Sequence, residues 1–248
     1  MKKKFSSIGI LGATVMFTIA VPATIFVMDQ KNKRELCAGF EDVKGLMLET
    51  KSGVPLRLNL TDEPIKVAVE SFNEQDKKQV VSAIERLDDI SKNLNYTILD
   101  SDNGHIDADI KIRYGSVGDE TTLGNTHLTF NEKTAVINYP IDIKIDPSVQ
   151  NWRDTETNET ALSFVVKHEM MHTLGFRDIY DKNLMDKTIM FHTIANVSDY
   201  TTMDETNIKK LYDDRLVSVK RANQADFVVT FADQETKKEE NEENELSL

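Results

Sequence analysis

Apolar and polar residues alternate in several short stretches between residues 64 and 145, and this period of two predicts strands. Between the first and second stretches, apolar residues recur every three or four positions, which predicts a helix from Asn73 to about Leu94. The expected strands are, in chain order, residues 64–70, 96–99, 108–114, 123–130 and 135–139, the last running on towards residue 145. This region should therefore form a sheet accompanied by one long helix.

A continuous apolar run leads into the most distinctive motif of the chain. Residues 161–166 are mostly apolar, and residues 167–178 then read KHEMMHTLGFRD. We expect one helix from about Glu159 to Leu174, with a buried face that holds its polar side chains still. A later helix should start near residues 204–206, and one or two extra strands are expected between residues 216 and 232.

The residue types and spacing in this motif indicate metal chemistry. His168 and His172 lie one turn apart on one face of the helix, so both can bind a single metal ion. Glu169 is next to the first histidine, where it can reach a metal-bound water. Gly175 allows a sharp turn after the helix, and Asp178 returns as a candidate third ligand. Zinc with three protein ligands keeps a position for a water whose pKa it lowers, and Glu169 would move the proton from that water to a leaving amine.

The pattern HExxHxxGxxD, followed by a methionine, resembles that of the metzincin zinc peptidases and in particular their matrixin-like bacterial members. The resemblance implies that the zinc ligands are His168, His172 and Asp178. It also implies that Glu169 is the general base, and that Met190 lies in a tight turn beneath the metal. Many metzincins have histidine where this chain has Asp178, whereas some secreted bacterial members have aspartate.

The same resemblance implies an α+β zincin fold, with a mostly five-stranded twisted sheet, a long helix and an active-site helix. It places the strand at residues 123–128 at the sheet edge beside the cleft. An extended substrate could pair with that edge by adding a strand to the sheet. The peptidase domain would then span residues 61–215, followed by a carboxyl-terminal extension over residues 216–234.

Other residues compete for these roles. Asp181 is a second candidate for the third ligand, or could hydrogen-bond the turn or a ligand histidine. Met185 is a second candidate for the turn methionine. His192 could stabilise the oxyanion, as a tyrosine does at that place in several metzincins, or be an ordinary surface residue. Glu205 could be the third ligand of a different zincin class, although its place at a helix start is also explained by the helix dipole.

The two ends of the chain differ in character from the middle. Three lysines at residues 2–4 precede an uncharged apolar run at residues 8–28, which predicts a membrane anchor or, if cleavage follows Ala23, a signal peptide. Residues 29–60 are expected to be a spacer or pro-like segment with short apolar runs, and residues 235–248 an acidic disordered tail. A simple amino-terminal anchor usually exports the domain behind it, so we expect a catalytic domain outside the cell membrane, or a secreted one, in a Gram-positive bacterium.

The composition of the chain restricts the kinds of partner that are expected. The net charge is −12 and the basic residues form no patch with aromatics, so protein or peptide substrates are expected and nucleic acid is not. Cys37 is the only cysteine, which excludes an internal disulfide, and a monomer is expected. The leading hypothesis is a zinc-dependent endopeptidase. The alternative is a catalytically inactive zinc-binding homologue that acts as a surface binding module.

Overall fold

The computed structural model describes residues 45–61, 63–99, 107–118, 122–152, 161–193 and 197–213, together with the backbone of two strands nearer the chain ends. The strands are β1 (Thr14–Val15), β2 (Arg57–Leu58), β3 (Ile65–Glu70), β4 (Tyr96–Leu99), β5 (Ile110–Tyr114), β6 (Gly124–Asn131), β7 (Val136–Ile145) and β8 (Phe227–Ala232). The helices are α2 (Glu74–Ile90), α3 (Leu162–Thr173) and α4 (Thr202–Tyr212), with short 3-10 turns η2 (Pro147–Asn151) and η3 (Lys182–Leu184).

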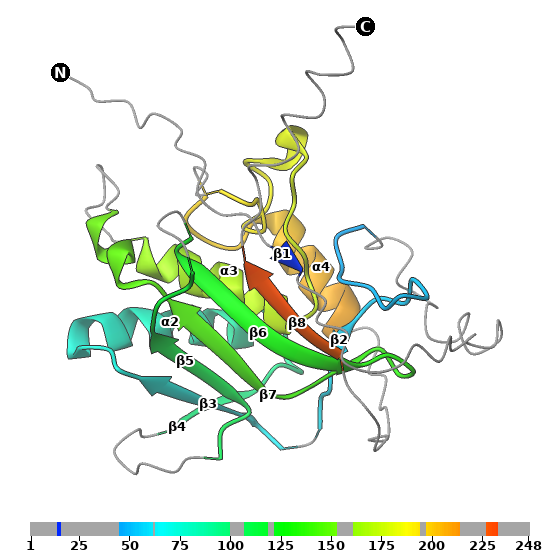
Figure 1. Cartoon of the computed structure of the whole chain (residues 1–248), viewed down its shortest axis with the longest axis horizontal. Helices are drawn as coiled ribbons and strands as arrows, with labels where there is room; N and C mark the ends of the chain where they lie inside the picture. Colours follow the sequence, from blue (N-terminus) through cyan, green and yellow to red (C-terminus); the bar gives the residue numbers. More distant parts are fainter. Residues whose placement is uncertain are drawn as a thin grey trace, which may run out of the picture.

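The centre of the domain is a sheet of five strands in the order β4-β3-β5-β7-β6, shown in Figure 1. The first four of these strands run parallel to one another, whereas β6 runs antiparallel to β7. The ladders keep the alternating apolar residues on the buried side, as with Ile110 opposite Ile141 and Ile112 opposite Ile143. The expected α+β fold with a five-stranded sheet is confirmed.

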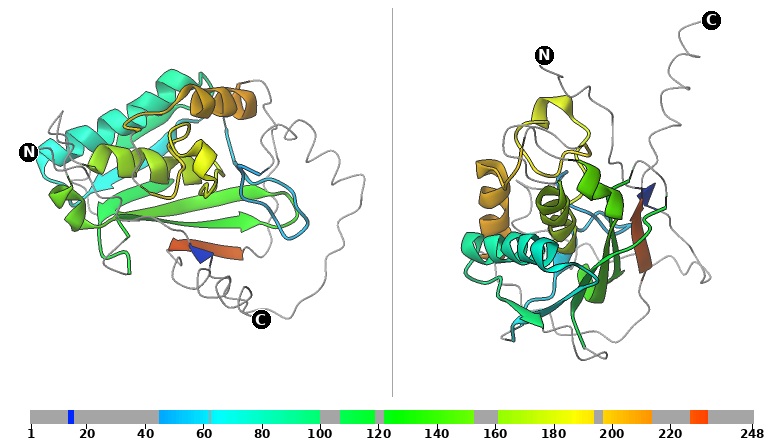
Figure 2. Two further views of the ribbon diagram at one scale, coloured as in Figure 1. Left: turned by 90° about the horizontal axis from the view of Figure 1, so that it is seen from above. Right: turned by 90° about the vertical axis from the view of Figure 1, so that its left-hand side faces the viewer.

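All three helices lie on the same side of the sheet, as Figure 2 shows. Helix α3 packs between α2 and the strands β6 and β7, so its histidines lie deep in the domain beside the edge of the sheet. The Asn73 side chain caps α2 by accepting from two backbone N–H groups, as the sequence predicts. The helix ends at Ile90, four residues earlier than expected, because Ser91 is extended and starts a turn that still buries Leu94.

A glycine ends the motif helix. Gly175 has φ +92°, a conformation that side chains rarely allow, and a Cβ at this position would lie 2.5 Å from the carbonyl oxygen of Leu56. The chain can therefore reverse tightly against the segment that carries Leu56. Of the helix expected over residues 159–174, the structure describes residues 161–174, and residues 153–160 lie outside the described part.

The segment from residue 45 to residue 61 is part of the folded core. Met47 forms an antiparallel bridge with Phe176, and β2 pairs in parallel with β7. The buried apolar residues of the segment are Met47, Leu48, Val54, Leu56 and Leu58. The two short apolar runs noted in the sequence thus pack against the end of α3, which differs from the spacer expected there. Residues 29–44 lie outside the described residues.

Strand β8 extends the sheet beyond β6, and β1 pairs with β8 in turn. Of the expected membrane-spanning run at residues 8–28, the structure describes only Thr14–Val15, as strand β1. Among the helices that the structure describes, none is both long and apolar enough to span a bilayer. Within residues 216–232, where one or two strands were expected, the structure describes one, β8. The tail at residues 235–248 and Cys37 lie outside the described residues.

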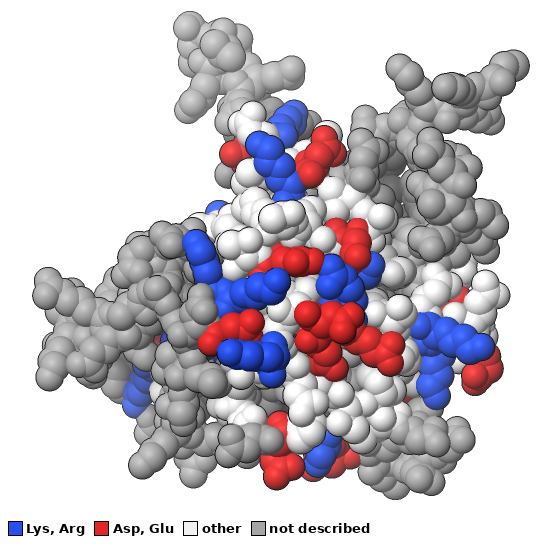
Figure 3. All heavy atoms as spheres, turned by 180° about the vertical axis from the view of Figure 1, so that it is seen from behind, with Lys and Arg blue, Asp and Glu red and all other residues white. Residues whose placement is uncertain are grey.

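Charged side chains of both signs are mixed on the face shown in Figure 3. One mixed cluster joins two helices: Arg86 on α2 bonds both Asp199 and Glu205, the latter on α4. Lys167, on α3, also pairs with Asp199 at 3.0 Å. These partly exposed pairs help fix the packing of α2, α3 and α4, although each exposed pair contributes little by itself.

Candidate metal centre

The two motif histidines converge on one point, and the backbone fixes both rings. His168 Nδ1 lies 2.8 Å from the carbonyl oxygen of Ile189, and His172 Nδ1 lies 2.9 Å from that of Phe176. A carbonyl oxygen only accepts, so each Nδ1 donates its hydrogen, and in a neutral ring the lone pair is then on Nε2. Both side chains are buried. The sequence thus presents two oriented nitrogen donors, as metal sites commonly do.

Asp178 completes a three-donor arrangement. Its Oδ1 lies 2.9 Å from His168 Nε2 and 3.6 Å from His172 Nε2. Two ligands of a tetrahedral zinc with bonds near 2.0–2.1 Å are about 3.4 Å apart, and the observed distances bracket that value. The second oxygen, Oδ2, is buried and has no hydrogen-bond partner within the described part of the chain. The Gly175 turn thus returns Asp178 to the two histidines, as expected from the spacing.

The charges in this centre favour a bound cation. Burial lowers the pKa of His168, but the hydrogen bond and charge of Asp178 outweigh burial and raise that pKa to about 9. Burial would raise the pKa of the Asp178 carboxyl, but the nearby histidines more than offset it, so the pKa is lowered. Both ring nitrogens of His168 face acceptor oxygens, so without a metal a hydrogen on each nitrogen satisfies the two contacts. A divalent metal ion bound at Nε2 would replace one of these hydrogens.

Glu169 lies against strand β6. Its Oε2 accepts a 2.6 Å hydrogen bond from the hydroxyl of Thr126, which is itself fully buried. Donor atoms of His168, Glu169 and His172 all lie within 4.8 Å of one another. Burial raises the pKa of Glu169, and the charges of the two histidines oppose that rise. A carboxylate in this environment is a stronger base than one in water.

Gly124, also on β6, makes room for this glutamate. A Cβ at position 124 would collide with Glu169 Oε1 and would lie 2.7 Å from Val165 Cγ1. Neither Gly124 nor Thr126 was identified as a site residue from the sequence. A glycine inside an alternating strand is the signal that could have indicated close approach of another group.

The turn that carries Met190 is bonded to the helix that follows it. Asp204, buried at the start of α4, accepts from the Thr188 hydroxyl at 2.5 Å and from the Ile189 backbone N–H at 2.9 Å. The Ile189 carbonyl in turn accepts from His168. Asp204 therefore supports the His168 ring through one intervening residue, Ile189. The sequence indicated only that Asp204 lies at an acidic helix start.

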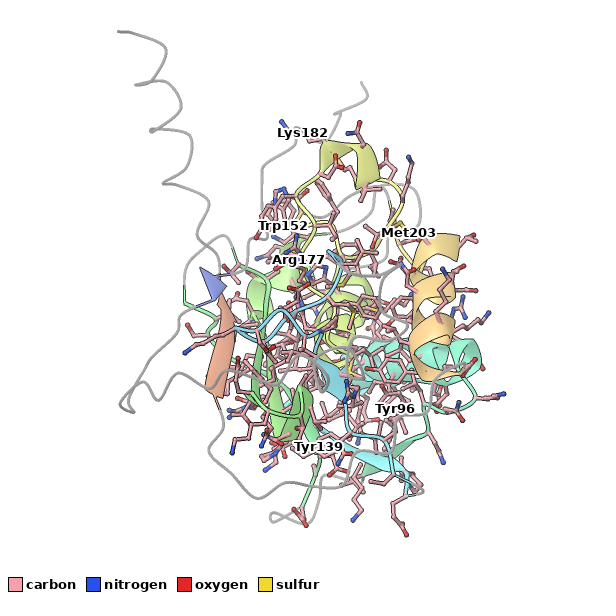
Figure 4. The ribbon with its side chains drawn as sticks, turned by 90° about the vertical axis from the view of Figure 1, so that its right-hand side faces the viewer. Tyr96, Tyr139, Trp152, Arg177, Lys182 and Met203 are labelled. Carbon is pink, nitrogen blue, oxygen red and sulfur yellow. The ribbon has the colours of Figure 1, made fainter. Side chains whose placement is uncertain are left out.

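The competing residues lie elsewhere or make other bonds. Asp181 is exposed and accepts from the backbone N–H of Asn183 in η3, the turn in which Figure 4 shows Lys182 projecting away from the domain. Met185 is exposed, whereas Met190 is buried. Glu205 is bonded to Arg86 on α2.

His192 lies closer to the centre than these. Its ring stacks on Tyr180, with ring centroids 4.6 Å apart, and its charge helps lower the pKa of Asp178. His192 is half-buried, and its backbone N–H donates to the carbonyl of Ile179. It thus lies beside the third donor, as a group at the rim rather than within the three-donor set.

Comparisons with known proteins identify a family and two similar structures. A family model described as matrixin, of the M10 peptidases, matches residues 61–213. A crystal structure of myroilysin is 14% identical, covers 60% of this chain and 82% of its own, and superposes with a TM-score of 0.39. A second myroilysin structure is 13% identical, covers 62% and 94%, and has a TM-score of 0.40. No curated protein matches the chain.

Proposed function

Because the chain belongs to the matrixin family of zinc endopeptidases, we propose that it cleaves peptide bonds at the centre on α3. In this proposal His168, His172 and Asp178 hold Zn²⁺ and Glu169 is the general base. The observation that carries it is the meeting of two oriented Nε2 atoms with Asp178 Oδ1 beside a buried carboxylate. The substrates are proteins or peptides.

The donor set supports zinc of the catalytic kind. Two nitrogens and one carboxylate oxygen are ligands that zinc accepts, and three protein ligands leave one coordination position open. When bound, the ion would polarise the substrate carbonyl and lower the pKa of a water molecule. The backbone carbonyls of Ile189 and Phe176 hold the rings in the tautomer that such binding requires.

Glu169 moves the proton. As the oxygen of a water bonds to the carbonyl carbon, Glu169 takes the proton of that water. As the carbon–nitrogen bond breaks, the same carboxyl gives the proton to the leaving amine. Thr126 keeps the carboxylate in place by donating to Oε2, while Oε1 lies against Gly124 and has no side chain there to displace it. The raised pKa of Glu169 suits both halves of this exchange.

Changing Glu169 to glutamine tests this role. Glutamine keeps the size of the side chain but cannot take a proton, so we expect stoichiometric zinc and a loss of about 10²–10⁴-fold or more in kcat/KM on a peptide library. The matched control is Glu205→Gln, which removes a carboxylate on α4 and should leave activity intact. Full activity of Glu169→Gln would contradict the mechanism. Zinc without turnover in the unmodified enzyme would instead indicate a binding module.

We also propose that the enzyme acts outside the cytoplasm. The support is the apolar run at residues 8–28 behind a lysine-rich start, a pattern of the sequence alone. Cell fractionation and digestion of intact cells with an added protease would test this location. Enzyme found only in the cytosolic fraction would exclude it.

A further inference from the structure

Strand β6 offers one long edge that passes the candidate metal centre. Its inner side pairs with β7, and its first residues adjoin Glu169, through Thr126 and Gly124. An extended peptide that adds a strand to this edge would lay its backbone across the catalytic groups. The outer side of β6 is therefore the expected place for a substrate.

The chain itself places a strand on that edge. Strand β8 pairs antiparallel with β6, in the register His127 with Thr230, Leu128 with Val229, Thr129 with Val228 and Phe130 with Phe227. Figure 1 shows β8 lying along β6. The paired residues of β6 follow directly after Thr126, and the antiparallel direction takes β8 from Phe227 towards the end of β6 that touches Glu169. The pairing with β8 thus begins at His127, the residue after Thr126, whose hydroxyl donates to the Glu169 carboxylate.

The composition and the register of β8 favour stable pairing there. The sequence FVVTFA of residues 227–232 consists mostly of β-branched and aromatic residues, which favour strands. Four consecutive residues of β8 lie opposite four consecutive residues of β6. A substrate strand that takes the position of β8 must therefore break this backbone pairing.

We infer that residues 227–232 act as a built-in strand that competes with extended peptide substrates for the edge of β6, and so restrain the enzyme. This inference rests on the proposed function. It assigns the carboxyl-terminal extension an inhibitory role at the substrate edge. Release of β8 opens the edge, and its return closes it.

The first test weakens β8 in the full-length chain. Val229→Pro removes a backbone N–H and strains the strand, whereas the matched control Val229→Thr keeps a β-branched residue. On a long fluorogenic peptide we expect kcat/KM to rise about tenfold for the proline variant and to stay unchanged for the control. Added peptide corresponding to residues 225–234 should inhibit the proline variant by raising KM and not by lowering kcat.

The second test locks the strand in place. In a Cys37→Ser background, His127→Cys and Thr230→Cys place two thiols at directly opposed positions, where cross-strand Cβ atoms are about 4.5–5.5 Å apart and within small adjustment of a disulfide. Oxidation should lower kcat/KM about tenfold, and a phosphine reductant should restore it. The kcat/KM of either single-cysteine variant should not respond to the oxidant or to the reductant.

The outcomes separate the two proposals. Failure of the disulfide to form would contradict the position of β8. Equal cleavage by the unmodified enzyme, Val229→Pro and the oxidised pair would overturn the inhibitory role while leaving the peptidase intact. Zinc-loaded Val229→Pro that cleaves no peptide would instead contradict the proposed function.

Discussion

Position 124 requires glycine because a larger side chain would collide with Glu169. It has an ordinary extended backbone, so no unusual φ requires glycine here, and the requirement comes from the Glu169 carboxylate lying directly over its Cα. Catalytic groups must be held within a fraction of an ångström of their working position. The position of the Glu169 carboxylate thus depends on two residues of β6. Thr126 donates a hydrogen bond to it, and Gly124 has no side chain that would displace it.

Gly124→Ala should displace Glu169 and leave the three metal donors in place. We expect kcat/KM to fall by about 10–100-fold with zinc content unchanged, since small displacements of catalytic groups cost that much. The measurement is peptide cleavage together with metal analysis. Gly115→Ala is the control, because a Cβ there meets only methylene groups of Lys144 at 3.6 Å. Equal activity of both variants would show that Glu169 tolerates displacement.

At the scale of elements, α4 supports the centre without contributing a donor atom. Its capping residue Asp204 holds the Thr188–Met190 turn, and that turn supplies the carbonyl that orients His168. The same carboxylate also caps its own helix by accepting from the backbone N–H of Thr201. One buried side chain therefore joins helix formation to ring orientation.

Asp204→Asn should weaken both functions. An amide keeps only one accepting oxygen, whereas both carboxylate oxygens accept here, from the Thr188 hydroxyl and from the backbone N–H groups of Ile189 and Thr201. We expect a loss of about 1–3 kcal/mol in the free energy of unfolding and weaker zinc binding, measured by thermal melting and by competition with a chromogenic chelator. The neighbouring Glu205→Gln, which alters a partly exposed pair, should change stability by less than about 1 kcal/mol. Unaltered zinc affinity in Asp204→Asn would contradict the link.

A carboxyl on α2 should make stability depend on pH. Burial raises the pKa of Asp88 to about 6, with Asp89 and Glu85 adding to the rise and the backbone N–H of Tyr96 opposing it. The folded state therefore holds this proton more tightly than the unfolded state. Between the pKa of Asp88 in the unfolded chain and about 6, the free energy of unfolding falls as the pH rises. Above about pH 6 the whole cost of burying the ionised carboxylate is present.

Asp88→Asn removes that penalty and keeps an oxygen that can accept from Tyr96. We expect a higher melting temperature than the unmodified protein above pH 6.5, and a difference that shrinks to nothing near pH 4. The quantity to compare is the difference between the two proteins at each pH, because loss of metal affects both. Asp186→Asn, at an exposed site, should show no such trend. A constant difference for Asp88→Asn would contradict the assignment.

Elements with a clear period were predictable, and contacts between distant segments were not. The alternation at residues 64–70 and the spacing around Asn73 gave the strands and the helix to within a few residues, because burial of one face leaves its period in the sequence. The spacing from His168 to Asp178 likewise predicted the convergence of three donors. Leu94 was misplaced because a buried loop residue continues the apolar period after the helix has ended.

The metal centre joins three parts of the whole molecule: helix α3, the return after Gly175 and, through Ile189, the methionine turn. A ligand that binds only the folded state stabilises it by an amount set by its concentration relative to Kd, about 4 kcal/mol at a thousandfold excess. Removal of the metal should therefore loosen all three parts together.

Treatment with a chelator should lower the melting temperature by on the order of 10 °C, a shift that zinc restores. Glu169→Gln keeps the three donors and should respond in the same way. Asp178→Asn loses the carboxylate, so its melting temperature should be lower before the chelator is added and should fall much less afterwards. Scanning calorimetry with and without chelator gives all three values. A chelator effect of equal size in Asp178→Asn would remove that residue from the donor set.

Residues 45–60 lie ahead of the family match that begins at residue 61, yet they pack against the Gly175 turn. The Leu48 backbone N–H donates to the Gly175 carbonyl at 2.8 Å, and the Arg177 N–H donates to the carbonyl of Leu46. Tyr212 adds a further tie, since its hydroxyl donates to the carbonyl of Leu174 and accepts from the N–H of Leu58. A version trimmed to the family boundary at residue 61 would therefore lose the backbone hydrogen bonds that hold the turn between α3 and Asp178.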